Sequence, residues 1–280
     1  MTSNQRVAVV TGSSTGNGYE TSLTLPRNGF LTYATMRNLN KGDNIKSLAE
    51  KEKLPLKTVQ LDVTDDISVK NAIQSIAAES NRIDVLVNNA GYTVVGAFEG
   101  LSMEEIKALH ETNLFGVIRV TQAVLPIMRR QKSGIIVNIS SALGRFGFPI
   151  TSAYVSTKFA IEGLSESMAY ELEPFGIKMV LVESGFIKTN MGDNRVTAKK
   201  SQDPNSPYSE LIQKLVRSLF HMMENGSSAE VVAKAVLKAV TSENPSLRYL
   251  AGKDAEGWIE EKRSMSDEEF HKMMKQNMMK

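Results

Sequence analysis

Short apolar runs alternate with longer segments of helical periodicity over most of the chain. Runs rich in β-branched residues predict strands at residues 6–10, 30–36, 59–63, 84–87, 134–139, 178–182 and 247–251. Between several of these runs, apolar residues recur three and four positions apart, which is typical of helices that bury one face. This alternation favours a parallel sheet with helices on both faces. The pattern therefore predicts an α/β fold with a single doubly wound parallel sheet of about seven strands.

Signals at the ends of helices support this arrangement. Ser102 and Glu105 have the S-x-x-E form of a capping box and predict a helix that runs to about residue 130. Ser227 and Glu230 predict the start of a later helix in the same way. Pro26 is expected to end or kink the first helix early, because proline lacks a backbone N–H group.

Composition narrows the class of protein. The chain has 280 residues, of which 41% are hydrophobic, and its net charge of +2 gives no basic footprint for nucleic acid. The absence of cysteine excludes disulfides and thiolate catalysis, and His110, His221 and His271 lack the spacing of metal ligands. No signal-peptide pattern and no apolar run long enough to span a membrane is present. We therefore expect a soluble cytoplasmic protein with no metal site.

The stretch from Gly134 to Glu173 carries candidate chemistry. Ser140 and Ser141 end a predicted strand, and Tyr154 and Lys158 lie one turn apart on one face of the predicted helix that follows. An ammonium group at that distance is expected to lower the pKa of a phenol by stabilising the phenolate. Tyr154 is then expected to serve as a general acid or base. If Ser141 lies against Tyr154, its hydroxyl can hold a carbonyl or alkoxide oxygen while Tyr154 exchanges the proton. The spacing by itself also fits two ordinary helix residues.

A glycine-rich loop follows the first predicted strand. Gly12, Gly16 and Gly18 lie in the sequence TGSSTGNG, which then opens a helix. Glycines at this place let the backbone turn tightly and approach a phosphate, and the free N–H groups of a helix start attract its charge. The loop predicts a nucleotide-binding site, and a simple turn is the alternative.

Polar residues follow several other predicted strands. Arg37 and Thr35 stand at the end of the second strand with no acidic residue nearby, which suits the 2′-phosphate of an adenosine ribose, with a solvated arginine as the alternative. Asp62 ends the third strand, where it suits an adenine amino group or the cap of the next helix, and Asn89 follows the fourth strand. Ligands of parallel sheets bind at the carboxyl ends of the strands. These residues therefore predict one site shared with the glycine loop and Ser141.

Taken together, these motifs resemble the classical short-chain dehydrogenase/reductase family over roughly residues 5 to 252. The resemblance rests on T-G-x-x-x-G-x-G at 11–18, N-N-A-G at 88–91, and Ser141 thirteen residues before the Y-x-x-x-K motif at 154–158. The segments YATMR and YVSTKFAIEGLSESMAYEL are most similar to the steroid and retinol dehydrogenase-like members. The resemblance implies a single Rossmann-type domain.

The resemblance also implies a catalytic tetrad of Asn113, Ser141, Tyr154 and Lys158. Tyr154 would protonate a carbonyl during hydride transfer, Lys158 would lower the tyrosine pKa and bind the ribose, and Asn113 would hold a water that relays protons. Asn113 lies inside a predicted helix, where asparagine is a poor helix former, although an exposed or packed asparagine is the alternative. The implied cofactor contacts are Gly12, Ser14, Thr15, Gly16, Asn17, Gly18, Arg37, Asp62, Val63, Asn89, Tyr154, Lys158, Ile187 and Thr189.

Two positions depart from the family pattern. Asn17 stands where the family usually has an aliphatic residue, although the backbone N–H group that contacts a phosphate is kept. Ser184 and Gly185 replace the usual Pro-Gly, which weakens the assignment of the loop with Ile187 and Thr189 near the carboxamide.

The resemblance therefore predicts an oxidoreductase that interconverts a carbonyl and a primary or secondary alcohol, with NADP(H) favoured over NAD(H). A dinucleotide-binding regulatory protein without turnover is the alternative, although such proteins usually lose the tyrosine or lysine. Nucleotide-sugar epimerases also use a Tyr/Lys pair, but they are longer and have different glycine spacing. Family habit implies a homodimer or homotetramer built on the helices around 104–130 and 152–173.

The C-terminal third is less regular. Residues 190–228 are polar at both ends around one apolar helical face, which predicts a small helical lid over the substrate, with a packed surface helix as the alternative. Residues 253–280 mix charges with methionines. This tail is expected to cover the substrate mouth, pack on a partner or fray. We assign residues 1–252, with the lid, to one domain and 253–280 to the same domain or a partly mobile tail.

Overall fold

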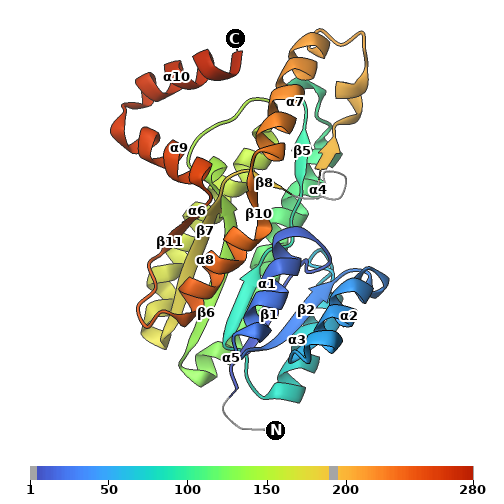
Figure 1. The fold of residues 1–280 in the computed structure, drawn as a ribbon, viewed down its shortest axis with the longest axis vertical. Coiled ribbons are helices and arrows are strands. Elements are labelled where there is room, and N and C mark those ends of the chain that lie inside the picture. Colours follow the sequence, from blue (N-terminus) through green and yellow to red (C-terminus); the bar gives the residue numbers. More distant parts are fainter. Residues whose placement is uncertain (1–4, 189–194, 280) are drawn as a thin grey trace.

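Seven parallel strands form one sheet, in the order β11-β7-β6-β4-β1-β2-β3, in the computed structural model, which describes residues 5–188 and 195–279 (Figure 1). The strands of this sheet are β1 Val7–Val10, β2 Leu31–Met36, β3 Leu56–Gln60, β4 Val85–Asn88, β6 Gly134–Ser141, β7 Ile177–Ser184 and β11 Arg248–Ala251. The strand order reverses between β1 and β4, and ligands of open parallel sheets bind at the carboxyl ends of the strands at such a point. The predicted doubly wound parallel sheet is confirmed.

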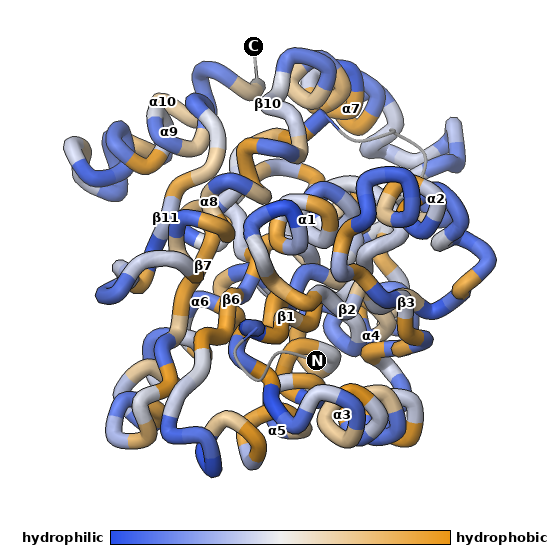
Figure 2. The backbone as a smooth tube through the Cα atoms, turned by 60° about the horizontal axis from the view of Figure 1, so that its bottom comes forward, coloured by the Kyte–Doolittle hydropathy of each residue, from blue (hydrophilic) through white to orange (hydrophobic). Residues whose placement is uncertain are grey.

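The central strands are buried on both faces, which explains why they are apolar without a clear alternation. Val7 and Val9 of β1 pack into a cluster with apolar residues of the helices on one face, whereas Ala8 and Val10 pack into a separate cluster on the other. Figure 2 shows the sheet between these two helical layers. The helices of the first face are α3 Asp66–Ser80, α5 Gly116–Gln131 and α6 Ser152–Leu172, and those of the second are α1 Gly16–Arg27, α2 Asp43–Glu52 and α8 Ala229–Thr241.

The helix predicted from Ser102 to about residue 130 is present, and a π-helical turn interrupts its α-helical geometry near the middle. It comprises α4 (Met103–His110), a π-helical turn (Glu111–Phe115) and α5. The capping box is confirmed, because Ser102 Oγ accepts from Glu105 N at 3.1 Å and Glu105 Oε2 accepts from Ser102 N at 2.8 Å. The π-helical turn contains Asn113, and such turns are frequent at functional sites.

Two local predictions were wrong, and one helix was missed. The third strand is Leu56–Gln60 and not 59–63, because it is an edge strand that pairs with β2 from Thr32 to Met36 and stops where β2 stops. Ser227 does not cap α8. The residue before α8 is Ser228, whose side chain makes no capping hydrogen bond, because Ser227 and Ser228 form a short strand. Helix α2 was not predicted.

Pro26 lies within the last turn of the first helix and does not interrupt it. Helix α1 continues through Pro26 to Arg27 and ends one residue after the proline.

Apart from α8 and β11, the helices and strands after β7 stand beyond the carboxyl edge of the sheet (Figure 1). They are β8 Ile187–Lys188, β9 Arg195–Thr197, α7 Ser209–Glu224, β10 Ser227–Ser228, α9 Lys253–Ser264 and α10 Asp267–Met279, and β9 pairs with β5 Thr93–Val95. Apolar residues of α7, α9 and α10 share one buried cluster with the loop after β6. The helix predicted within residues 190–228 is therefore present, and its apolar face is packed.

Short single turns complete the chain, at Leu39–Gly42, Phe98–Gly100, Ala142–Gly144, Glu173–Phe175 and Lys199–Gln202. Over residues 5–188 and 195–279, no helix is both long and apolar enough to cross a membrane.

Candidate active site

The structure brings Ser141, Tyr154 and Lys158 together at the carboxyl edge of the sheet. Ser141 is the last residue of β6, and both other residues lie on α6, which packs against that strand. Lys158 Nζ donates a hydrogen bond to the carbonyl of Ile139 at 2.8 Å and lies 5.5 Å from the centroid of the Tyr154 ring. The hydrogen bond fixes the ammonium group beside the phenol. This geometry places a cation beside the phenol of Tyr154.

The electrostatics of Tyr154 differ from the sequence-based expectation. Burial raises the pKa of Tyr154 to about 12, and hydrogen bonding with Ser141 and Thr93 acts in the opposite direction. The expected lowering of this pKa by Lys158 was therefore wrong for the protein without a cofactor. Desolvation of the phenolate dominates, and the Lys158 ammonium group is hydrogen-bonded to a carbonyl oxygen.

The pKa of Lys158 also departs from its ordinary value. Burial lowers the pKa of Lys158 to about 8, and the Glu162 carboxylate one helical turn later opposes that shift. At neutral pH the side chain thus keeps its charge, which positions a cation beside the phenol.

Asn113 is buried and uses its side chain to hold two segments together. Its Nδ2 donates to the carbonyl of Tyr92 at 2.9 Å and to Thr157 Oγ1 at 3.3 Å, and its Oδ1 accepts from Tyr92 N at 3.0 Å. These bonds connect the π-helical turn with the loop after N-N-A-G and with α6, between Tyr154 and Lys158. Asn113 therefore lies where it can order the residues around the tyrosine.

The glycine loop is tightly constrained by Asn89. The Asn89 side chain donates to the carbonyls of Thr11 at 2.9 Å and Gly12 at 3.1 Å. Gly12 has φ of +69°, and a Cβ atom there would lie 2.8 Å from Ala90 Cα, so the position requires glycine. A methyl group at Gly18 would collide with the Gly12 carbonyl and the Asn89 amide.

The start of α1 next to this loop has the features of an anion-binding site. Thr15 is the N-cap of α1 but makes no side-chain capping bond, so the first N–H groups of the helix are not capped by it. Asn17 Oδ1 is buried without a hydrogen-bond partner. Ser14, Gly16 and Asn17 all lie at this helix start. The uncapped N–H groups fit an anionic ligand, whereas the Asn17 oxygen can only accept a hydrogen bond from a donor group.

Arg37, Asp62 and Val63 lie at the ends of β2 and β3. Arg37 directly follows β2, its side chain is exposed, and its guanidinium has no hydrogen-bond or ion-pair partner among the described residues. Asp62 Oδ1 accepts from Thr64 N at 3.0 Å and from Thr64 Oγ1 at 2.8 Å. The cap of α3 is Asp65, whose side chain accepts from Ser68 N, so Asp62 is not the helix cap.

The loop after β7 contains the remaining predicted contacts. Ile187 is buried in β8, which pairs with β10. Ser184, which stands in place of the usual proline, accepts a hydrogen bond from Ser141 Oγ at its carbonyl, at 3.2 Å. Thr189 lies outside the described residues.

Sequence reasoning missed a buried ionic cluster behind Lys158. Arg248 Nε of β11 lies 3.0 Å from Glu162 Oε2 of α6 and 2.9 Å from Glu183 Oε1 of β7. Arg145, in the loop after Ser141, lies 3.0 Å from the same oxygen of Glu183. The only signals in the sequence are Glu162, one turn after Lys158, and the charge of Glu183 within an otherwise apolar strand.

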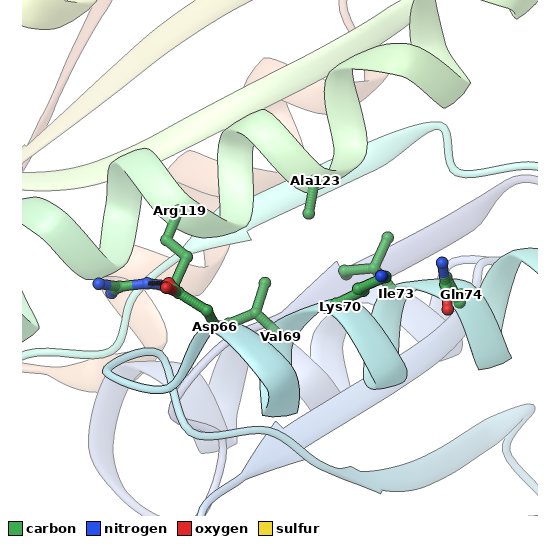
Figure 3. A pocket seen from close by; sticks show the side chains of 7 residues that line it. All are labelled: Asp66, Val69, Lys70, Ile73, Gln74, Arg119 and Ala123. Carbon is green, nitrogen blue, oxygen red and sulfur yellow. Dashed lines mark hydrogen bonds and ion pairs between the residues drawn. The ribbon is translucent and has the colours of Figure 1, made fainter.

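Two cavities lie outside this arrangement. The first, of about 180 Å³, lies between α3 and α5, where Val69 and Ile73 point into the groove and Arg119 reaches Asp66 (Figure 3). It contains none of the predicted site residues. The second, of about 510 Å³, lies where the loop after β7 meets α7 and α9, and its lining includes Phe186, Met222 and Trp258.

Comparison with known proteins agrees with this geometry. Retinol dehydrogenase 8 of Bos taurus is 37% identical over 254 residues, which cover 87% of this chain and 80% of that protein. Human 17-beta-hydroxysteroid dehydrogenase type 1 is 33% identical over 252 residues, covering 87% of this chain and 76% of that protein. The solved structure of ElxO with NADP bound matches with a TM-score of 0.74 at 28% identity, over 89% of this chain and 97% of that chain.

The sequence profile described as short chain dehydrogenase matches residues 6–200, a span that includes the glycine loop, Ser141, Tyr154 and Lys158. This match and these relatives confirm the resemblance to steroid and retinol dehydrogenase-like proteins. The chain is therefore an oxidoreductase that belongs to the short-chain dehydrogenase family.

Proposed function

We propose that the protein is an NADP(H)-dependent carbonyl reductase or alcohol dehydrogenase in which Tyr154 is the general acid and base. The observation that carries this proposal is the convergence of Ser141, Tyr154 and Lys158 at the same carboxyl edge of the sheet as the glycine loop. When bound, a nicotinamide cofactor supplies or accepts the hydride. The protein itself binds and orients the reactants and moves the proton at the Tyr154 oxygen.

Each side chain has a definite task in this proposal. A pKa of about 12 keeps the Tyr154 hydroxyl protonated at neutral pH, so it is ready to donate a proton to a carbonyl oxygen. The Ser141 hydroxyl holds that oxygen, after exchanging its bond to the Ser184 carbonyl. The Lys158 ammonium stabilises the phenolate that remains, and Asn113 orders the segment around them.

The cofactor-binding part of the proposal rests on the uncapped start of α1 and on Arg37. Gly12 and Gly18 let the loop pack closely against Ala90 and Asn89, and Gly16 is the first residue of α1, whose N–H groups attract negative charge. The exposed guanidinium of Arg37 fits a 2′-phosphate, for which bidentate hydrogen bonding is favourable. Asp62 and Val63 would face the adenine, and Ile187 and Thr189 the carboxamide.

We propose an apolar alcohol or ketone as substrate. The relatives named above act, by their names, on retinol and on 17-beta-hydroxysteroids. In this chain Tyr154 adjoins the apolar cluster of the loop after β6 and of α7, α9 and α10. Helix α7 would act as the lid, and the 510 Å³ cavity beside Phe186 would be part of the substrate path.

We also propose that the protein is a cytoplasmic homodimer or homotetramer. The support for an oligomer is the exposure of large apolar residues on the helices that family habit places at the interface. Phe115 is 48% exposed, Phe159 is 46% exposed and Tyr170 is 79% exposed.

The test is oxidation of NADPH and NADH, followed at 340 nm, with a panel of steroid, retinoid and simple ketones and aldehydes. Turnover is expected to prefer NADPH and to fall at least a thousandfold in Tyr154→Phe, which keeps the ring but removes the proton donor. The variant Arg37→Ala is expected to lose about 1.5–3 kcal/mol of NADPH binding, with little change for NADH. Tight cofactor binding without turnover on any substrate would favour a regulatory protein instead.

A further inference from the structure

The C-terminal segment holds the loop that follows β7. Phe186 N donates to Asp254 Oδ2 at 2.6 Å, and Asp254 lies in the first turn of α9. Two further bonds complete the attachment, because Gly185 N donates to the carbonyl of Ala251 at 3.0 Å and Ser227 N donates to the carbonyl of Phe186 at 3.0 Å. The bond to Asp254 is short and charge-assisted, which makes it the strongest of the three.

The position of the Asp254 carboxylate is determined by two glycines. A methyl group at Gly185 would collide with the carboxylate, so the loop approaches it as closely as backbone alone allows. Gly252 has φ of +114°, and a Cβ atom there would lie 2.7 Å from Asp254 Oδ1. The N-terminal turn of a helix also favours a negative charge. The carboxylate is thus both confined and stabilised in the orientation that receives the Phe186 N–H group.

The contact between Phe186 and Asp254 lies next to Ser184, which stands where the family usually has proline. Proline before Gly185 would fix φ and stiffen the loop, whereas Ser184 leaves that dihedral free. The next residues, Phe186 and Ile187, have to be held in another way.

We propose that Asp254 is a positioning residue that fixes the Gly185–Ile187 backbone for the nicotinamide end of the cofactor. This inference rests on the proposed function, because it requires that Ile187 lies at the carboxamide. The C-terminal segment then completes the cofactor site from outside residues 6–200, the span that matches the family profile.

The chain contains its own reporter for this contact. Trp258 is the only tryptophan and lies on the same helix as Asp254. Its ring packs edge-on against Phe186, with 5.4 Å between the centroids. Trp258 also contacts the rings of Phe146 and Phe148, so its emission responds to movement of Phe186 within this aromatic group.

The experiment compares Asp254→Ala, Asp254→Asn and Glu256→Ala in the full-length protein. Asparagine keeps an oxygen that accepts from Phe186 N. Glu256 is exposed, is also an acidic residue in the first turn of α9, and makes no hydrogen bond to the loop among the described residues, so it controls for the helix terminus. Trp258 emission is recorded without cofactor, and NADPH affinity is obtained from its quenching on titration.

We expect Asp254→Ala to change the Trp258 spectrum and to weaken NADPH binding about tenfold, which corresponds to about 1.4 kcal/mol. Asp254→Asn should recover most of the affinity, and Glu256→Ala should bind as the wild type does. In steady-state assays, the loss should appear mainly in the KM for NADPH.

The outcomes separate this inference from the proposed function. If the wild type binds neither NADPH nor NADH, the proposed function fails. If the wild type binds NADPH and Asp254→Ala binds it within twofold, the positioning role is refuted while the proposed function stands. Equal losses in Asp254→Ala and Glu256→Ala would also refute it, because the helix terminus and not the contact to Phe186 would be responsible.

Discussion

Replacement of Arg248 by methionine tests whether the buried ionic cluster supports the fold around the tyrosine. The side chains of Glu162 and Glu183 are 7% and 0% exposed, so water cannot replace the guanidinium between them. Methionine keeps an apolar stem of similar length and removes the charge. Glu183 keeps Arg145 at 3.0 Å, whereas Glu162 loses the guanidinium that it contacts.

The expected loss of stability in Arg248→Met follows from two independent arguments. Removal of one partner from a buried ion pair costs about 3–5 kcal/mol. Alternatively, the unpaired Glu162 binds a proton, and protonation at pH 7 of a carboxyl with an ordinary pKa of 4.5 costs about 3.4 kcal/mol. Both lead to a decrease of about 3 kcal/mol in the free energy of unfolding at pH 7. Glu166, which is 53% exposed, contributes little, and Glu166→Gln should cost less than about 0.5 kcal/mol.

The pH dependence distinguishes this cause from loss of packing. Burial raises the pKa of Glu162, the Glu183 charge adds to that effect, and Arg248 opposes it. Without Arg248, the pKa in the folded state rises further above the unfolded value. The folded state then holds a proton that the unfolded state releases, so the variant regains stability as the pH falls. The loss should therefore shrink as the pH falls from 7 to 5, by at most about 1.4 kcal/mol for each pH unit, which is the limit for one proton.

The assay is urea denaturation of the wild type, Arg248→Met and the double variant Arg248→Met/Glu162→Gln at pH 7, 6 and 5. The double variant should recover much of the loss at pH 7, because a neutral amide replaces the unpaired charge. A loss of similar size at all three pH values, or no loss at pH 7, would refute the electrostatic reasoning.

Two further predictions concern the proposed site. Because the Glu162 carboxylate raises the pKa of Lys158 against burial, Glu162→Gln should move the alkaline limb of kcat/KM for carbonyl reduction from about pH 8 to lower pH, whereas Glu166→Gln should leave it in place. An unmoved limb would mean that Lys158 does not titrate there. Gly18→Ala should weaken NADPH binding at least tenfold in a fluorescence titration, because its methyl group collides with the glycine loop. Gly163→Ala on α6, with nothing within 4 Å of the added atom, is the matched control, and equal binding by both variants would contradict the assignment of the loop.

The central strands and the Tyr154 helix could be predicted because their signals are local. A strand buried on both faces is a continuous apolar run, and β1, β4 and β6 all have this form. Strand β3 could not be placed correctly, because it is an edge strand in which Lys57 and Gln60 are exposed. The apolar residues Leu61 and Val63, which suggested a later strand, are buried in the segment that follows it.

The electrostatic features could be predicted only in part, because they depend on solvent access and not on spacing. The pair Tyr154 and Lys158 has the predicted separation, but burial reverses the predicted direction of the tyrosine pKa. Glu183 illustrates the same limit. Its charge within an apolar run suggests a buried partner, yet nothing near it in the sequence identifies Arg145 or Arg248 as that partner.

The contact between Asp254 and Phe186 joins residues that are 68 positions apart, and it changes how the sequence departure at Ser184 is interpreted. Judged by the family pattern alone, loss of the proline weakens the loop that carries Ile187. In the structure, however, the same loop is held by a carboxylate from α9 and by the backbone of β10 and β11. A residue that departs from a motif is therefore best evaluated together with its partners in space, and here the partner belongs to a segment that contains no motif.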